Sequence, residues 1–144
     1  MRLLLVLVLS SAPGCSSLQG RDCSTEYRLY DVTLTRTLDV PATNVDRTTM
    51  QACLDDACTA VPTPDSSGHA TFGTFGATSG ELTLSTAEDG RLRVSATFRV
   101  GERAGAAGLR VIVRESSAAR THAAEGIVTF AGDGCHSAPA STTV

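Results

Sequence analysis

Five cysteines are the residues of this 144-residue chain with the widest choice of chemistry. A cysteine can form a disulfide, bind a metal as its thiolate, act as a nucleophile or carry a lipid. The five lie at positions Cys15, Cys23, Cys53, Cys58 and Cys135. Their number is odd, so at least one of them is expected to do something other than form an internal disulfide. The surrounding residues indicate which one.

Cys15 follows a segment with the order of a secretory signal. Arg2 precedes the apolar run of residues 3–9, and the small residues "SSAPG" follow it. Seven apolar residues span about 10 Å as a helix, whereas a bilayer core needs about 30 Å. The run is therefore too short for a transmembrane helix, and residues 1–14 are predicted to be a cleaved signal peptide.

The sequence "SAPGC" resembles a bacterial lipobox, in which the peptidase cuts before a cysteine that carries a diacylglyceryl group. Gly14 is the expected small residue before the cut, whereas Ala12 and Pro13 depart from the usual pattern. We expect Cys15 to be lipidated, with a palmitate-type acyl chain, and residues 15–22 to form a short tether. The alternative is a secreted protein that is cut elsewhere and keeps Cys15 as a thiol.

The other four cysteines form an even set in a chain that is expected to be exported, where disulfides persist. In "CLDDAC" a hairpin with its turn at residues 54–57 places Cys53 opposite Cys58, and opposed residues lie about 4.5–5.5 Å apart, within disulfide reach. We predict a Cys53–Cys58 bridge, which leaves Cys23 to pair with Cys135. Crossed pairings, including a bridge between two sheets, stay open.

"CLDDAC" also contains two thiolates beside two carboxylates, the residue types of a metal site. Structural zinc needs two ligand pairs at about two to four residues' spacing. The remaining candidates, Cys135 and His136, are adjacent and distant from the hairpin. We therefore expect no metal and no cofactor.

The three histidines are His69, His122 and His136. A hydrolase would need one of them beside a nucleophile, and no Gly-x-Ser-x-Gly motif is present. Exposed or lightly packed histidines in loops are the favoured interpretation, and no enzyme activity is expected. An envelope hydrolase using a loop histidine is the alternative.

Arginine is concentrated in one part of the chain. Residues 22–90 contain eleven acids and three arginines, whereas residues 91–120 contain seven arginines and two acids. Arg91, Arg93 and Arg99 share one face of an expected strand, and Arg110 and Arg114 share a face of the next. If these strands pair, the five guanidinium groups form a candidate anion-binding face. A solvated sheet face with edge-protecting charge is the alternative.

Alternation of apolar and polar residues dominates the rest of the sequence. It is clearest in "YDVTLTRTLDV" and "RLRVSATFRV", and shorter examples are "TTMQACL", "CTAV", "ATFGTF", "ELTLST", "LRVIVRE" and "GIVTF". Turn signals such as "TPDSSG" and "EDG" separate them. Seven to eight short strands of this kind predict an all-β protein, an antiparallel β-sandwich over residues 23–137 with a polar tail at 138–144. An immunoglobulin-like topology is favoured over a jelly roll or small barrel.

The combination of an exported N-terminus, a strand ending "LDVP", the segment "MQACLDDACTAV" and a C-terminal "GC" resembles a group of small lipoproteins from high-GC bacteria. The resemblance covers most of residues 23–136 and implies an Ig-like sandwich with a Cys-x4-Cys hairpin. It implies a location and no activity.

A lipid-anchored module of the bacterial cell envelope is therefore expected, on the cell membrane or outer membrane and facing the periplasm or exterior. Its role is predicted to be binding or structural, and a passive subunit of an envelope complex is an alternative. The expected partners are the membrane, through the lipid on Cys15, and anionic headgroups, wall polymers or an acidic protein. Nucleic acid is disfavoured by the net charge of −3 and the 4% aromatic content.

Overall fold

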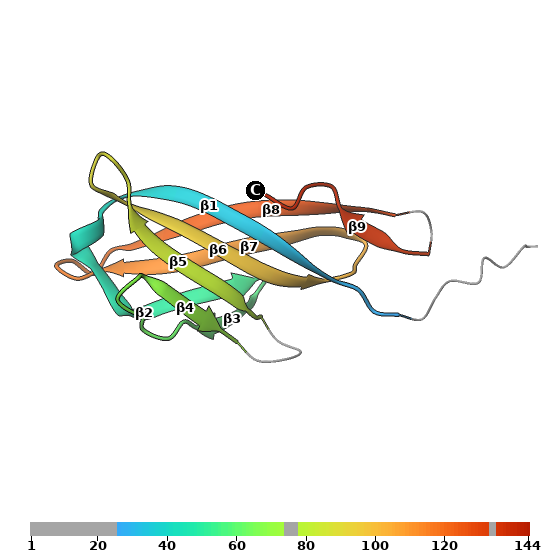
Figure 1. Ribbon diagram of the computed structural model, residues 1–144, viewed down its shortest axis with the longest axis horizontal. Coiled ribbons are helices and arrows are strands. Elements are labelled where there is room, and N and C mark those ends of the chain that lie inside the picture. Colours follow the sequence, from blue (N-terminus) through green and yellow to red (C-terminus); the bar gives the residue numbers. More distant parts are fainter. Residues whose placement is uncertain (1–25, 74–77, 133–134) are drawn as a thin grey trace, which may run out of the picture.

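The computed structural model describes residues 26–73, 78–132 and 135–144, and these residues form a sandwich of two antiparallel sheets (Figure 1). The four-stranded sheet contains, in spatial order, β1 (Leu29–Pro41), β6 (Arg91–Gly101), β5 (Gly80–Thr86) and β4 (His69–Phe72). The five-stranded sheet contains β3 (Ala57–Ala60), β2 (Val45–Leu54), β7 (Gly105–Glu115), β8 (Thr121–Gly132) and β9 (Ser137–Pro139). The predicted antiparallel β-sandwich is confirmed, while the predicted signal peptide and tether lie outside the described residues.

The strands form where the sequence alternates, because successive side chains of a strand point to opposite faces of the sheet. β6 shows this clearly. Its even-numbered residues from Leu92 to Val100 are fully buried, whereas Arg91, Arg93 and Arg99 are exposed. All eight predicted strands are present, and the core lies between the two sheets. Its largest fully buried side chains are Phe72, Phe98, Leu34, Met50, Leu82, Leu92 and Leu109.

The strand order contains two pairings between strands that are distant in sequence, β1 with β6 and β2 with β7. The order β1–β6–β5 corresponds to strands B–E–D of an immunoglobulin sandwich, and β3–β2–β7–β8 corresponds to C′–C–F–G. The chain crosses from one sheet to the other between β1 and β2, between β3 and β4, and between β6 and β7. The last of these crossings decides where the arginines lie.

The sandwich has two different ends. We call the end where β1 begins the proximal end; it also holds the β2–β3 turn and the end of β6 (Figure 1). We call the other end the distal end; it holds the 3₁₀ helix η1 (Ala42–Asn44), the β5–β6 turn and the β7–β8 loop. The Ala42 N–H donates to the Gly90 carbonyl (3.0 Å), and Ser117 donates to the Asn44 side chain, which ties these three connections together.

The C-terminal residues complete the sandwich, contrary to the expectation of a polar tail at 138–144. β9 pairs with β8, and Thr143 then forms a parallel bridge with Thr33 of β1. The Val144 N–H donates to the Thr33 carbonyl at 3.0 Å. The side edge of β1 would otherwise present unpaired backbone groups, so this pairing satisfies them.

The described residues contain no helix with the length and hydropathy of a membrane span.

Candidate functional site

The predicted Cys53–Cys58 disulfide is present and joins opposed residues of β2 and β3. Cys53 is fully buried, although it lies on the outward-facing side of β2. Cys135 is also disulfide-bonded. Its predicted partner Cys23, and the predicted lipidation site Cys15, lie outside the described residues.

The five arginines of the predicted anion-binding face do not share a surface. Arg91, Arg93 and Arg99 lie on the outer face of the four-stranded sheet, whereas Arg110 and Arg114 lie on β7 in the five-stranded sheet. The condition for a shared face was that the two strands pair, and they do not, because the chain crosses between sheets after β6. Alternation in the sequence defines the two faces of each strand, but it does not define which strand lies beside it.

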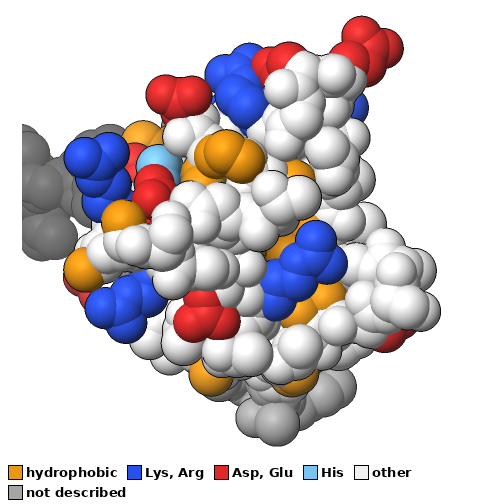
Figure 2. Space-filling view, turned by 90° about the vertical axis from the view of Figure 1, so that its left-hand side faces the viewer, with side chains coloured by type: hydrophobic (Ala, Val, Ile, Leu, Met, Phe, Trp, Pro, Cys, Tyr) orange, Lys and Arg blue, Asp and Glu red, His pale blue; other side chains and the backbone are white. Residues whose placement is uncertain are grey.

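Several of these arginines also have nearby acidic partners. The Arg91 Nε lies 2.5 Å from the Asp89 carboxylate, and the Arg99 Nε lies 3.6 Å from that of Asp31. Figure 2 shows the distal end of the molecule, where acidic and basic side chains are interspersed and form no single basic patch. The arrangement fits solvated, locally compensated charge better than a concentrated anion-binding surface.

Two of the three histidines are part of polar pairs, which the sequence did not indicate. The His122 Nε2 lies 2.7 Å from the Glu115 Oε1 between β8 and β7. The His136 Nδ1 lies 3.1 Å from the Glu102 Oε1, and the same oxygen accepts the Ser137 N–H. This N–H is the main reason that the pKa of Glu102 lies below its ordinary value. Both pairs join neighbouring segments, and His69 begins β4.

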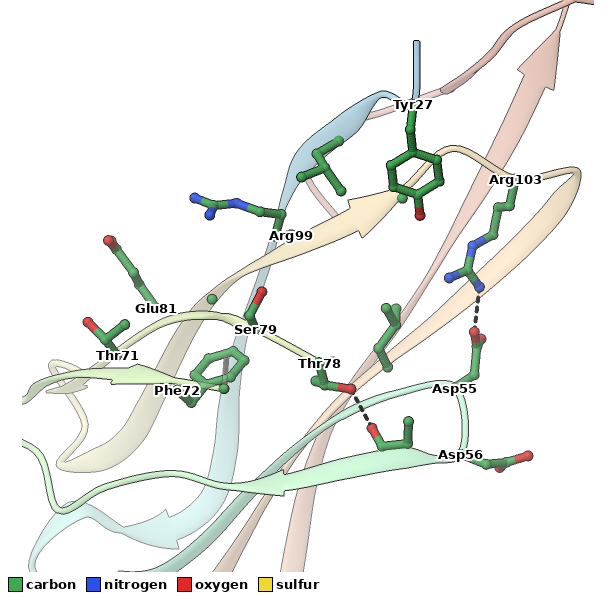
Figure 3. Close-up of a pocket in the computed structure, with 16 residues that line it drawn as sticks. Tyr27, Asp55, Asp56, Thr71, Phe72, Thr78, Ser79, Glu81, Arg99 and Arg103 are labelled. Atoms are coloured by element: carbon green, nitrogen blue, oxygen red, sulfur yellow. Dashed lines mark hydrogen bonds and ion pairs between the residues drawn. The ribbon is translucent and has the colours of Figure 1, made fainter. Parts of the chain in front are cut away.

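A cavity of about 880 Å³ lies at the proximal end of the two sheets and reaches the outer face of the four-stranded sheet (Figure 3). Its lining comes from the starts of β1 and β5, the ends of β4 and β6, the β2–β3 turn and the β6–β7 connection. The lining residues used below are Tyr27, Leu29, Leu54, Asp55, Asp56, Phe72, Thr78, Glu81, Arg99 and Arg103. Of the five predicted arginines, Arg99 is the one that lines it.

One wall of the cavity is built around Asp55. This residue has a left-handed backbone (φ +53°), which fits its place in the two-residue β2–β3 turn and which aspartate tolerates better than most residues. The Gly108 N–H donates to its Oδ1 (2.9 Å), and the Asp55 N–H donates to the Gly108 carbonyl (2.7 Å). The Arg103 guanidinium donates to its other oxygen. The Gly108 bond, followed by Arg103, lowers the pKa of Asp55 despite partial burial.

The opposite wall is built around Phe72, which is only 1% exposed and packs edge-to-face on Phe98 with ring centroids 5.4 Å apart. The Thr78 hydroxyl donates to the Ala57 carbonyl (2.7 Å) and links the two sheets across the cavity. A Cβ at Gly101 would lie within 2 Å of the Tyr27 hydroxyl, at 1.6 Å. Glycine is therefore needed there for Tyr27 to lie over the end of β6.

No motif in the sequence indicates this cavity as a site. Asp55 lies in the predicted hairpin turn at residues 54–57, and Arg103 lies in the glycine-rich segment "GERAGAAG", which contains no binding motif. The two residues are 48 positions apart, and no local spacing signals their contact. The exposed Tyr27 just before β1 is the one feature that could have drawn attention, because aromatic residues are scarce in this chain.

The described residues contain no cluster of three or more His, Cys, Asp or Glu side chains that could hold a metal ion. Comparisons of the chain with protein-family models, with curated proteins and with solved structures find no match. Function must therefore be argued from the cavity and from the sequence signals.

Proposed function

We propose that this protein is a lipid-anchored binding module of the bacterial cell envelope, and that its ligand site is the proximal cavity. The observation that supports this most is the size and lining of the cavity. Its volume of about 880 Å³ lies in the range of small-molecule sites, which are about 300–1,000 Å³. Its walls combine apolar side chains with a few charged and hydroxyl groups, the composition expected of such sites.

The anchor follows from the lipobox-like sequence at Cys15. Tyr27 at the cavity lies twelve positions after Cys15, and at about 3.3–3.6 Å per residue this segment reaches at most roughly 40 Å. A disulfide to Cys23 would shorten the reach further. The ligand site would thus lie near the membrane surface, facing the periplasm or exterior.

Other roles have less support. A basic face for anionic headgroups, wall polymers or an acidic protein needed five arginines on one sheet, and they are divided between two. A hydrolase needs a nucleophile beside a histidine, whereas His122 contacts Glu115 on the neighbouring strand. The cavity favours binding over a passive structural role.

The anchor is tested by the intact mass of the protein extracted from membranes with detergent. We expect a diacylglyceryl-type adduct on Cys15 and release of the Cys15→Ser variant from the membrane fraction. An unmodified Cys15 in membrane-extracted protein would contradict the anchor.

The ligand site is tested by native mass spectrometry of protein purified from its own membranes. We expect the wild type to carry a noncovalent small-molecule adduct that is lost in Leu29→Trp, whose larger side chain fills the mouth of the cavity. Leu29 is 47% exposed, so the change should not prevent folding. Ile127→Trp, on the outer face of β8, is the control. An adduct retained equally by both variants would place the ligand elsewhere, and no adduct at all would favour the passive role.

A further inference from the structure

The apolar part of the cavity lining is continuous with the core. Phe72 is fully buried, Leu54 is partly buried against the core, and Leu29 is half exposed at the mouth. A ligand that covers Leu29 and Leu54 would remove apolar surface from water, which contributes roughly 25 cal/mol per Å² before the costs of association. The occupant therefore needs an apolar body.

The charges on the five-stranded side of the cavity leave one carboxylate uncompensated. Asp55 is bonded to Arg103, and Asp56 is the adjacent residue of the same turn. Asp56 is exposed and forms no ion pair with any described residue. This side of the lining thus has one cation and two carboxylates.

The four-stranded side also has a carboxylate without an ion pair. The Arg99 Nε lies 3.6 Å from the carboxylate of Asp31, its cross-strand neighbour on β1, which lies outside the lining. Glu81 of β5 lines the cavity and has no ion pair within 4 Å among the described residues. The lining as a whole therefore has three carboxylates, Asp55, Asp56 and Glu81, and two cations, Arg99 and Arg103. Figure 3 shows Glu81 and Asp56 at opposite ends of the lining, with Phe72 and Thr78 between them.

Tyr27 adds a third feature at the mouth. Its side chain is 72% exposed, unusually high for a large aromatic, and its hydroxyl lies against Gly101 at the end of β6. The face of an aromatic ring attracts ammonium and guanidinium groups, and quaternary ammonium ligands are bound in this way. The exposed ring therefore favours the same sign of ligand charge as Asp56 and Glu81.

We propose that the proximal cavity binds a small amphipathic cation, whose apolar body covers Leu29 and Leu54 and whose ammonium group lies between Tyr27 and an uncompensated carboxylate, Asp56 or Glu81. This inference rests on the proposed function, because it names the ligand class of the same cavity. It reverses the sign of the ligand expected from the arginines. The reason is that Arg99 and Arg103 both have acidic partners, while the remaining lining charges are negative.

The test compares three probes with the same eight-carbon chain and different head groups: octyltrimethylammonium, octanol and octanoate. The mature chain carries Cys15→Ser so that no detergent competes, and both its disulfides are verified by mass. Binding is followed by amide NMR shifts of the cavity residues. We expect the cation to bind about fivefold or more tighter than the alcohol, and the carboxylate to bind weakest.

The carboxylates are tested with Asp56→Asn and Glu81→Gln together. This double variant should bind octyltrimethylammonium no more tightly than octanol. The matched control is Asp39→Asn with Glu88→Gln, two exposed acids near the distal end, which makes the same change in net charge and should leave the preference intact.

Three results would overturn the inference. The first is that octanol or octanoate binds the cavity as tightly as the cation. The second is that the control double variant reduces the preference as much as the cavity double variant, and the third is that the cation shifts map outside the cavity. In the first case the cavity still binds ligands, so the proposed function survives. That function is tested separately, by native mass spectrometry of the wild type and of Leu29→Trp.

Discussion

The two ends of the sandwich differ in how their aspartate side chains are hydrogen-bonded. Each must satisfy the polar groups of several connections between strands. At the distal end the aspartates bond locally: Asp46 accepts from the Thr48 N–H and hydroxyl and from Thr49, and Asp89 bonds Arg91 two residues on. A long-range bond is also present there, because Ser117 donates to the Asn44 side chain 73 positions away. At the proximal end Asp55 is bonded to residues 48 and 53 positions away.

This difference has a structural consequence. Bonds within a turn tighten the turn itself and do not depend on how the sheets are spaced. Bonds between distant segments hold those segments at fixed positions and allow space between them. The distal end combines such turns with the Ser117–Asn44 bond, while the proximal end, where Asp55 is bonded only to distant residues, holds a cavity between Asp55, Phe72 and the start of β1.

The largest expected effect contrasts the core with the cavity wall. Phe98→Ala should lower the free energy of unfolding by about 3–5 kcal/mol, since it leaves a void in a packed core. Leu29→Ala should cost clearly less, because that side chain lines the cavity and is 47% exposed. Urea denaturation followed by circular dichroism measures both. Equal losses would mean that the cavity is filled in solution.

The next effect is that of the proximal hairpin disulfide. Cys53→Ala with Cys58→Ala should lower the free energy of unfolding by about 2 kcal/mol, the loop-entropy value for a bridge that closes so short a segment. The variant must keep the Cys135 disulfide, which mass analysis before and after reduction verifies. A loss well above this value would show that the bridge also fixes the packing of the cavity wall.

Asp55 and Asp46 compare the two ends directly. Asp55→Ala should lower the free energy of unfolding by about 1–2 kcal/mol, from the lost Gly108 bond and the left-handed backbone, with the half-exposed Arg103 pair adding little. Asp55→Asn should lose less, because asparagine tolerates that backbone and can still accept from Gly108. Asp46→Ala should have a smaller effect than Asp55→Ala, since its partners can turn to water. The opposite order would contradict the contrast between the ends.

The smallest expected effects are those of single carboxylates on the free energy of unfolding at acid pH. Asp46, Asp55, Asp65 and Asp89 have pKa values below the ordinary 3.8, and Glu102 lies below 4.5, chiefly because hydrogen bonds favour their ionised forms. Lowered folded-state values mean that this stability is complete above the unfolded pKa and is lost as the pH falls through the folded pKa. Urea midpoints should therefore decline below about pH 4. Asp55→Asn should make the decline shallower, and an unchanged slope would contradict its assigned contribution.

The sequence was most informative where contacts are local. Period-two alternation located eight strands, because a strand with one buried face must place apolar residues at every second position. The spacing of Cys53 and Cys58 predicted their bridge, because a hairpin turn sets the distance between opposed residues. The ninth strand was missed, since the three residues Ser137–Pro139 carry too short a pattern to alternate visibly.

Tertiary structure alone decided which strands are neighbours, and therefore on which sheet each charged side chain lies. The alternation of apolar and polar residues indicates that Arg93 and Arg110 point outward. The crossing between β6 and β7 nevertheless places them on different sheets. The same holds for the cavity, where Tyr27, Asp55, Phe72 and Arg103 meet because three sheet crossings return the chain to one end. The sequence by itself thus determined the class of fold, its turns and its hairpin disulfide. The binding site arose from the strand order, because side-chain periodicity carries no information about which strand lies beside another.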